Sequence, residues 1–497
     1  MVPRAVRAAA AELADYPFHL GVASGYPTSN AVVLWTRLVP RPDQPGGGMP
    51  PLDFPLRFEV AADEGFRRIV ARGNAVAEAR FAHSVHQVVS GLQPARDYWY
   101  RFVAGAHAST VGRTRTLPAP RDAVDALRIV VASCQNYEHG HYAAWRHVAA
   151  SAPHMVLFVG DYIYENNGRT KQVRQHTGGV PLSLDEYRQR YALYQSDPAL
   201  QSAHASAPWF AVWDDHEVLN DYAGETPGRE EDHEVFMRRR AAAYQAWYEH
   251  LPVPPGMAPR NGAMRIYARA QLGQLAALHL LDQRQYRSPE ACPRPPQYGG
   301  LRVGADCAER LDPARTMLGA EQERWLADGL KQQHGAWTLL AQGTAFAQVD
   351  ESMGDKPEYW TDAWTGYPAA RQRLLDALRE KRAANPVILG GDIHCSMVAG
   401  INTVADRFDT ALLASEFVAT SITSNPVPQT TLDKWKANNP NLQQLDGSHR
   451  GYLSLTLSRK QLRADMVCVD DASNADSACR VGSSWVVESG NPAILNG

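Results

Sequence analysis

From about residue 127 onward, short continuous apolar runs alternate with segments of helical periodicity. LRIVVASC, HMVLFVGD, PWFAVWDD and NPVILGGD are such runs, and SLDEYRQRYALYQSD and YPAARQRLLDALREKR are helical segments between them. Continuous apolar runs are typical of strands that helices cover on both faces. Ser183 and Glu186 also have capping-box spacing at a helix start. This part of the chain is therefore predicted to be a layered α/β domain.

The first 118 residues have a different pattern. LRFEVAAD, HSVHQVVSGL and DYWYRFVAG alternate apolar and polar residues, with turn residues between them. A period of two is typical of antiparallel strands with one buried face. GLQPARDYWYRF also resembles the pattern of fibronectin type III domains. We expect an N-terminal β-sandwich over residues 1–118, a linker over residues 119–126 and a catalytic α/β domain over residues 127–497.

Charge and hydropathy exclude several classes of function. The chain has 50 basic and 53 acidic residues and a net charge of −3, so no broad basic surface for sequence-specific nucleic-acid binding is expected. No run approaches the ~18 apolar residues that a transmembrane helix needs. Arg4, Arg7, Glu12 and Asp15 interrupt the alanine-rich start. We therefore expect no intact secretion signal, although a remnant of a removed or replaced signal fits the pattern.

The six cysteines contain no CxxC pair, which excludes a zinc ribbon or a thioredoxin-like site. Cys292 and Cys307 flank a Pro-rich loop, and Cys468 and Cys479 flank a polar loop. Disulfides of exported proteins often close loops of this kind, so we predict both bridges. Four unrelated thiols remain the alternative. Cys134 and Cys395 lie at the ends of apolar runs and are expected to be unpaired.

Each of the four apolar runs named above ends in, or is followed by, residues of types that commonly ligate metals. The residues are Cys134, then Asp161 with Tyr164, then Asp215 with His216 and Asn220, and finally Asp392 with His394. Chemistry in α/β sheets gathers at the carboxyl ends of strands. Thiolate and phenolate ligands favour a ferric ion, whereas carboxylate and amide oxygens suit a harder divalent ion such as calcium. Helix caps and solvated turns would explain one such ending, but not four in one chain.

Other catalytic motifs are incomplete. His216-Glu217 and His233-Glu234 do not continue to HExxH, because Asn220 and Met237 occupy the last position. Cys134 is followed by QNYEHG, which lacks the Arg of a C-x5-R phosphatase loop. The chain has no GK dipeptide for a Walker loop and no G-x-S-x-G elbow. These absences leave the metal-ligand pattern as the main functional signal.

VASCQNYEHG, VLFVGDYIYE, WDDHEVLNDY and GGDIHCSMVAG together resemble the PhoD-type alkaline phosphatases, a branch of the metallophosphoesterases. The resemblance extends from about Tyr16 to the last strands. It implies an N-terminal β-sandwich followed by a metallophosphoesterase domain, and an exported enzyme that hydrolyses phosphate monoesters and diesters. It also implies iron together with calcium or another divalent ion. Some members of the family act as phospholipase D.

On this resemblance, Fe(III) would be held by Cys134, Asp161 and Tyr164, with His394 as a further ligand. Asp161 would bridge to a second metal. The spacing from Asp161 to Tyr164 is also similar to that of purple acid phosphatases, in which tyrosinate binds Fe(III).

The second metal would be held by Asp215, Asn220 and Asp392. His216 stands where related metallophosphoesterases have their catalytic histidine. An Asp precedes it where the family pattern has Asn, so Asp214, Asp215 and Asn220 remain alternative ligands. Cys395 is interpreted as a packed core residue.

The expected reaction is metal-assisted hydrolysis of small-molecule phosphate esters, with His216 stabilising charge or protonating the leaving oxygen. One alternative is a phospholipase D-type phosphodiesterase that uses the same site and acts on phospholipid head groups. A second is a non-catalytic exported binding protein with structural metals.

Overall fold

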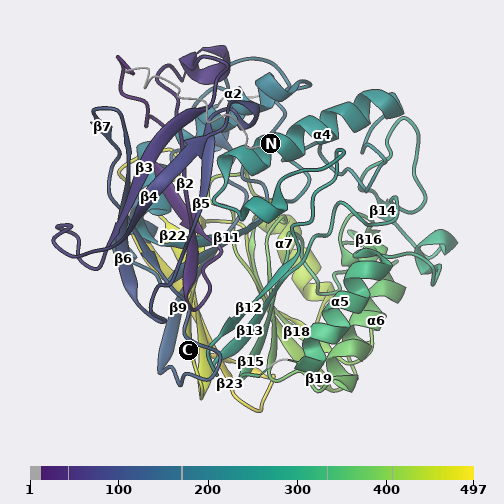
Figure 1. Cartoon of the computed structure of the whole chain (residues 1–497). Helices are drawn as coiled ribbons and strands as arrows, with labels where there is room; N and C mark the ends of the chain where they lie inside the picture. Colours follow the sequence, from purple (N-terminus) through teal and green to yellow (C-terminus); the bar gives the residue numbers. More distant parts are fainter. Residues whose placement is uncertain (1–12, 43, 169–171, 333, 406) are drawn as a thin grey trace.

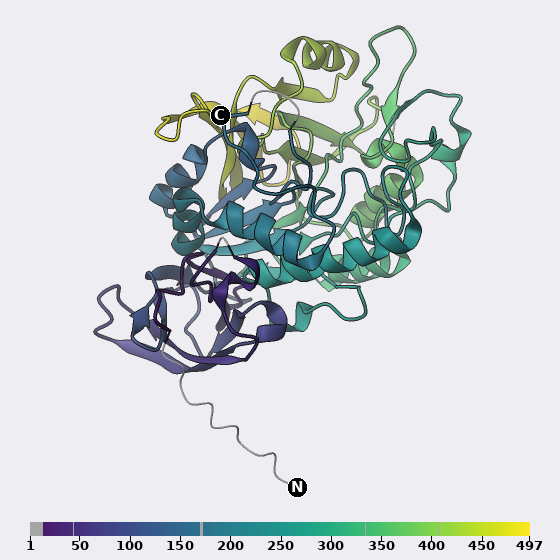
Figure 2. The ribbon, with the colours of Figure 1, turned by 90° about the horizontal axis from the view of Figure 1, so that it is seen from above.

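The computed structural model describes residues 13–42, 44–168, 172–332, 334–405 and 407–497. Residues 1–12, on which most of the expectation about a secretion signal rests, lie outside this described part. Two β-sheets lie at the centre, helices lie on the outside, and the N-terminal strands form one end of the molecule (Figures 1 and 2). The predicted layered α/β domain and the predicted N-terminal β-structure are both confirmed.

The first sheet is mixed. Its middle strands β9, β10, β11 and β1 are parallel neighbours, and antiparallel strands extend it on both sides. Across the sheet the strands are β24 (Ile494–Asn496), β23 (Cys479–Glu488), β22 (Gln461–Val469), β21 (Arg450–Ser458), β9 (Ala126–Ala132), β10 (Met155–Val159), β11 (Pro208–Val212), β1 (Val22–Gly25), β2 (Ala31–Arg37) and β5 (Ser84–Ser90).

The second sheet also has a parallel centre, made of β13, β15, β17 and β19. Across the sheet the strands are β12 (Ala268–Leu272), β13 (Ala276–Leu280), β15 (Trp337–Ala341), β17 (Pro386–Gly390), β19 (Leu412–Val418), β18 (Ser396–Asn402) and β20 (Leu442–Asp446). A separate pair is formed by β14 (Arg302–Val303) and β16 (Tyr359–Trp360).

Successive side chains of the central strands enter different cores. Val387 and Leu389 of β17 belong to the large core between the two sheets, whereas Ile388 packs into the core beneath the outer helices. Side chains alternate between the faces of a strand, so a strand with two buried faces must be apolar throughout. This is the physical reason for the continuous apolar runs in the sequence.

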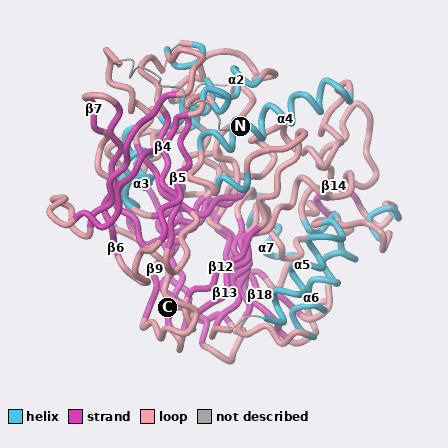
Figure 3. Tube along the Cα trace, in the orientation of Figure 1, coloured by secondary structure: helices cyan, strands magenta, loops and turns pink. Residues whose placement is uncertain are grey.

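Helices cover both sheets, as the cyan segments around the magenta strands show (Figure 3). Four contribute to the large core: α1 (Ala143–Ser151), α2 (Leu184–Gln195), α3 (Pro198–Ser206) and α4 (His233–His250). Three pack on the second sheet: α5 (Gly319–Gln332), α6 (Pro368–Glu380) and α7 (Gln429–Asn438). The predicted capping box of α2 is present, because Ser183 and Glu186 each accept a backbone amide of the other.

Short 3-10 helices occur in the connections. They are η1 (Pro45–Gly48), η2 (Ala79–Phe81), η3 (Tyr137–His139), η4 (Pro255–Met257), η5 (Ala308–Leu311) and η6 (Trp364–Gly366).

The N-terminal sandwich shares a sheet with the rest of the molecule. One layer is an antiparallel sheet of β4 (Ile69–Ala77), β3 (Phe54–Ala61), β6 (Asp97–Ala104), β7 (His107–Ala108) and β8 (Gly112–Arg115). It packs on the other layer, β1, β2 and β5, through a core that includes Val32, Leu34, Phe58 and Phe102. That second layer is the edge of the first sheet, because β1 pairs in parallel with β11. The sequence pattern did not indicate this continuity.

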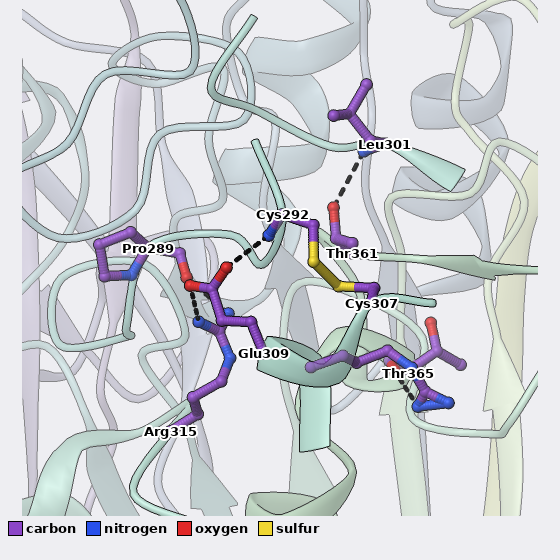
Figure 4. Close-up of a disulfide and its surroundings, with 9 residues drawn as sticks. Pro289, Cys292, Leu301, Cys307, Glu309, Arg315, Thr361 and Thr365 are labelled. Carbon is purple, nitrogen blue, oxygen red and sulfur yellow. Dashed lines mark hydrogen bonds and ion pairs between the residues drawn. A yellow bond between two sulfur atoms is a disulfide. The ribbon is translucent and has the colours of Figure 1, made fainter. Parts of the chain in front are cut away.

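The predicted disulfide between Cys292 and Cys307 is confirmed (Figure 4). It closes the Pro-rich loop, and the backbone amide of Cys292 donates to Glu309 at 2.7 Å. Leu301, inside this loop, donates its amide to the Thr361 hydroxyl. The loop is thereby attached to the segment that precedes η6.

The predicted disulfide between Cys468 and Cys479 is wrong, because both thiols are free. Cys468 of β22 lies opposite Arg480, and Cys479 of β23 lies opposite Val469. Opposite residues share a face of the sheet and successive residues alternate, so the two thiols point to different faces. The two residues flank the same loop, but the register of the hairpin separates their side chains.

Candidate metal centre

The four predicted ligand-bearing runs are strands whose carboxyl ends meet. β9, β10 and β11 are neighbours in the first sheet, and β17 belongs to the second. Ser133, after β9, bridges Ser421, after β19. Because β17 and β19 pair in parallel, this bridge brings the ends of the two sheets together. The candidate site is therefore assembled from both sheets, not from a single sheet edge.

Several candidate ligands have strained backbones. Cys134, Asp161, Asp392 and His394 have φ values of 58°, 60°, 68° and 51°. Residues with a Cβ rarely adopt this left-handed conformation, which costs on the order of 1–3 kcal/mol each. Such strain persists only where the surrounding structure fixes the residue, and it concentrates at functional sites. Each of these residues follows a buried strand that anchors the chain before the turn.

Two ligand clusters share Asp161. In the first, atoms of Cys134, Asp161 and His394 lie within 4.8 Å of one another, and in the second the same holds for Asp161, Asp215 and His216. A carboxylate shared by two clusters is what two neighbouring cations require, because one anionic ligand can then offset the charge of both.

A third cluster of Asp215, Asp221 and Asp362 adjoins the second through Asp215. Arg284 lies among these carboxylates. Its guanidinium contacts Asp214 at 2.5 Å, Asp362 at 2.6 Å and Asp215 at 3.7 Å. Arg284 therefore already supplies a positive charge to this side of the site.

The phenol of Tyr164 lies at the centre of the first cluster. It donates to Oδ2 of Asp161 at 2.8 Å, and Nε2 of His394 lies 3.0 Å away. The hydroxyl of Ser424 donates to it at 2.7 Å. Burial, together with the charges of Asp161 and Cys134, raises the pKa of Tyr164 well above its usual value. The phenolate form therefore requires a cation beside it.

The donor set fits metal ions. Oδ1 of Asp161 and Oδ2 of Asp214 are buried without a hydrogen-bond partner in the described part of the chain. A buried polar atom without a partner costs roughly 1–3 kcal/mol, and more if it is charged. Burial and neighbouring carboxylates raise the pKa of Asp161 well above its usual value and that of Asp392 to about 7. Bound cations would remove this excess of buried negative charge.

Glu165 positions His216. Oε2 of Glu165 lies 2.7 Å from Nδ1 of His216, and Oε1 accepts the backbone amide of Asn220 at 3.0 Å. Burial alone would lower the pKa of His216, but the carboxylates of Glu165, Asp215 and Asp161 raise it well above its usual value. The contact with Glu165 occupies Nδ1 of His216, so Nε2 is the ring nitrogen that this contact leaves available.

Glu217 holds the strand ends in place. Its carboxylate accepts the backbone amides of Asp161, Tyr162 and Asp214 at 3.0, 2.6 and 2.9 Å. Sequence reasoning treated Glu217 only as part of a motif and assigned no role to Glu165. The one sequence signal for both is their position directly beside predicted ligands.

Two of the predicted ligands, Asn220 and Asp392, are less clearly part of the clusters than the others. Asn220 is exposed, and Asp392 belongs to none of the three clusters found among the described residues. Asp392 nevertheless lies at the site, because its backbone amide contacts the Cys134 sulfur and its Oδ2 accepts the Thr344 hydroxyl at 2.9 Å. Tyr162 and Cys395 are core residues, as expected.

Three further residues of the site, Asp221, Arg284 and Asp362, were assigned no role from the sequence. Asp221 is next to Asn220 in the sequence, and its Oδ2 accepts the backbone amide of Gly300. Arg284 and Asp362 come from loops without a recognisable motif, so only the folded structure identifies them.

Family models match nearly the whole chain. The model described as PhoD-like phosphatase matches residues 129–466, and the model of the PhoD-like phosphatase N-terminal domain matches residues 4–118.

Individual proteins give the same result. Alkaline phosphatase D of Bacillus subtilis (strain 168) is 40% identical over 488 residues, which cover 97% of this chain and 82% of that protein. A solved structure described as the structure of PhoD superimposes with a TM-score of 0.92 at 39% identity, covering 98% of this chain and 93% of the other. Within the described residues, no helix has the length and apolarity needed to cross a membrane.

Proposed function

The chain belongs to the PhoD-like phosphatase family, and on that premise we propose that it hydrolyses phosphate esters at two metal positions on either side of Asp161. The observation that carries the proposal is the sharing of Asp161 between the cluster with Cys134 and His394 and the cluster with Asp215 and His216. No hydrogen-bond partner competes for Oδ1 of this carboxylate among the described residues.

We assign the first position to Fe(III), held by Cys134, Asp161, Tyr164 and His394. The thiolate and the phenolate support iron, since both are preferred by ferric ions over calcium or magnesium. His394 is suited to be a neutral ligand, because its Nδ1 donates to the carbonyl of Asn425 at 2.7 Å and Nε2 is thereby left with its lone pair.

We assign the second position to calcium or another divalent ion, held by Asp161 and Asp215, with Asn220 and Asp392 as further oxygen donors. When bound by these residues, the metals would supply positive charge that offsets the charge of a phosphoryl group.

His216 acts on the leaving oxygen of the ester. Nδ1 is fixed by Glu165, so the remaining ring nitrogen is the one that can donate a proton or stabilise developing charge. Its position beside Asp161 and Asp215, the carboxylates proposed to hold the second metal, supports this role.

The substrates we propose are small phosphate monoesters and diesters, with a phospholipase D-type diesterase as the alternative for the same site. The non-catalytic alternative is abandoned, because the chain is 40% identical to an alkaline phosphatase over 97% of its length. We also propose an exported protein, which the disulfide between Cys292 and Cys307 supports. Its domains would be the sandwich over residues 1–118, the linker over 119–126 and the catalytic domain over 127–497.

Elemental analysis combined with a phosphoester panel tests this function. Purified protein should contain iron and a divalent metal, and it should hydrolyse p-nitrophenyl phosphate, bis(p-nitrophenyl) phosphate or both. Chelator treatment should remove metal and turnover together. Turnover that survives complete metal removal would contradict the proposal.

A further inference from the structure

The segment from Thr423 to Asn425 contacts the candidate metal centre and also two cationic side chains beside it. Asn425 uses both of its backbone polar groups for this. Its amide donates to Nδ1 of His139 at 3.1 Å, and its carbonyl accepts from Nδ1 of His394 at 2.7 Å. The carbonyl of Thr423 accepts from Nε of Arg450 at 3.3 Å.

These contacts fix opposite tautomers in the two imidazoles. Since Nδ1 of His139 accepts a hydrogen bond, it carries no proton, and in the neutral ring the proton is on Nε2. His139 therefore presents an N–H donor where His394 presents a lone pair. Nε2 of His139 has no hydrogen-bond partner in the described part of the chain, and the ring is half-buried. The backbone of Asn425 thus leaves Nε2 of His394 able to bind a metal and Nε2 of His139 able to donate a hydrogen bond.

Arg450 lies at the same sheet edge. It is the first residue of β21, which runs antiparallel to β9 with Leu453 opposite Val131. Arg450 reaches the site through Thr423, whose carbonyl accepts from Nε of Arg450 and whose amide donates to the carbonyl of Cys134 at 3.4 Å. The guanidinium therefore contacts the same three-residue segment that bonds both imidazoles, and its positive charge adds to the larger effect of burial in lowering the pKa of His139 and of His394.

Among the residues that the structure describes, Arg450 has no anionic partner. The side chain is half-buried, yet no carboxylate lies within ion-pair distance of it among the described residues, and Nε is the one guanidinium nitrogen with a hydrogen bond there. By contrast, Arg284 and Arg287, which are fully buried, both bind carboxylates. A partly desolvated guanidinium without a counter-charge is unfavourable, and it is the side chain best suited to bind phosphate.

Resting on the proposed function, we propose that Arg450 and the Nε2–H of His139 bind non-bridging phosphoryl oxygens of the substrate beside the metal centre and so favour esters with more negative charge. A monoester at alkaline pH is a dianion, whereas a diester has one negative charge. The pair would therefore contribute more to binding the monoester, and it would also bind inorganic phosphate.

The test uses the metal-loaded full chain with Arg450→Gln, Arg450→Lys and, as control, Arg459→Gln. Arg459 follows the opposite end of β21, where it is exposed and contacts Gln274, so its replacement removes the same charge far from the site. Metal content is measured for each variant. KM is measured for p-nitrophenyl phosphate and bis(p-nitrophenyl) phosphate, together with the inhibition constant and thermal shift produced by inorganic phosphate.

Arg450→Gln should raise the KM for the monoester and the inhibition constant of phosphate by about tenfold, because a charge-assisted hydrogen bond is lost. The KM of Arg450→Gln for the diester should rise less than its KM for the monoester. Arg450→Lys should show smaller increases in the monoester KM and in the phosphate inhibition constant than Arg450→Gln. Arg459→Gln should match wild type in all three constants. Without phosphate, Arg450→Gln should melt close to wild type, because the variant loses no ion pair and only one long hydrogen bond, the one from Nε to the carbonyl of Thr423.

Equal changes for both esters, or an unchanged phosphate inhibition constant, would overturn the inference. The thermal shift by phosphate needs no turnover. If wild type hydrolyses neither ester, the proposed function fails, and the phosphate shift still decides whether Arg450 binds an oxyanion. An equal shift in wild type and Arg450→Gln would overturn the inference on its own.

Discussion

Oε2 of Glu165 lies 2.7 Å from Nδ1 of His216, and both side chains are buried. This contact determines which ring nitrogen of His216 can act on a substrate. Glu165 is itself fixed, because its other oxygen accepts the backbone amide of Asn220. We therefore expect Glu165 to position His216, and His216 to act on the ester.

Glu165→Gln should lower kcat by about 10- to 100-fold, because partners of this kind orient a functional imidazole and sustain its charge. KM and metal content should change little. Glu165→Asp should recover part of the loss, and Glu234→Gln, on the exposed surface of α4, should behave like wild type. Unchanged kcat in Glu165→Gln would show that the contact does not orient His216 for catalysis.

The iron-loaded protein should be coloured. Tyr164 is the tyrosine within contact distance of Asp161 and His394, so a ferric ion in the first cluster would acquire a phenolate ligand. Tyr164→Phe should remove or strongly shift the visible absorption band while the protein stays folded. A colourless iron-loaded wild type would rule out the ferric-tyrosinate assignment.

Peptide mapping without reduction should find one crosslink, between Cys292 and Cys307, in protein made in an oxidising compartment. The other four cysteines should all be alkylated after unfolding. Replacing both Cys292 and Cys307 by Ala should lower the free energy of unfolding by roughly 3 kcal/mol in the chain-entropy model. Urea denaturation measures this change, and a Cys468–Cys479 crosslink would contradict the hairpin register described above.

Acidification should destabilise the protein through His86, which lies far from the metal ligands. Burial lowers the pKa of His86 to about 4, against a usual 6.5, although the carbonyl of Val253 partly offsets this effect. Between these two values the unfolded chain binds a proton that the folded chain excludes, so stability falls as the pH falls. At pH 5 this amounts to about 2 kcal/mol.

His86→Phe, which keeps the stacking on Tyr248, should therefore lose less stability than wild type between pH 7.5 and pH 5. Urea unfolding at the two pH values measures the difference. Identical losses in both proteins would show that His86 does not titrate between the two states.

The strands that carry the ligands could be predicted because a strand buried on both faces leaves a continuous apolar run, and its polar ending marks the sheet edge. The Cys292–Cys307 bridge could be predicted from a short loop. That Cys468 and Cys479 stay unpaired could not be predicted. The face to which each thiol points depends on the register of the β22–β23 hairpin, which the composition of the loop does not encode. Arg284 and Asp362 could not be predicted either, since 78 residues separate them in the chain and only the fold pairs them.

We propose that Asp161 is shared by two metals while His216 acts mainly in turnover. This proposal is tested most directly by measuring the metal content of Asp161→Ala and His216→Ala, with Asp161→Asn as a variant of similar shape. Asp161→Ala should lose both metals and all activity. His216→Ala should keep most of its metal and lose about 10²–10⁴-fold in turnover of both esters. A metal-free His216→Ala, or an active Asp161→Ala that retains both metals, would contradict the account.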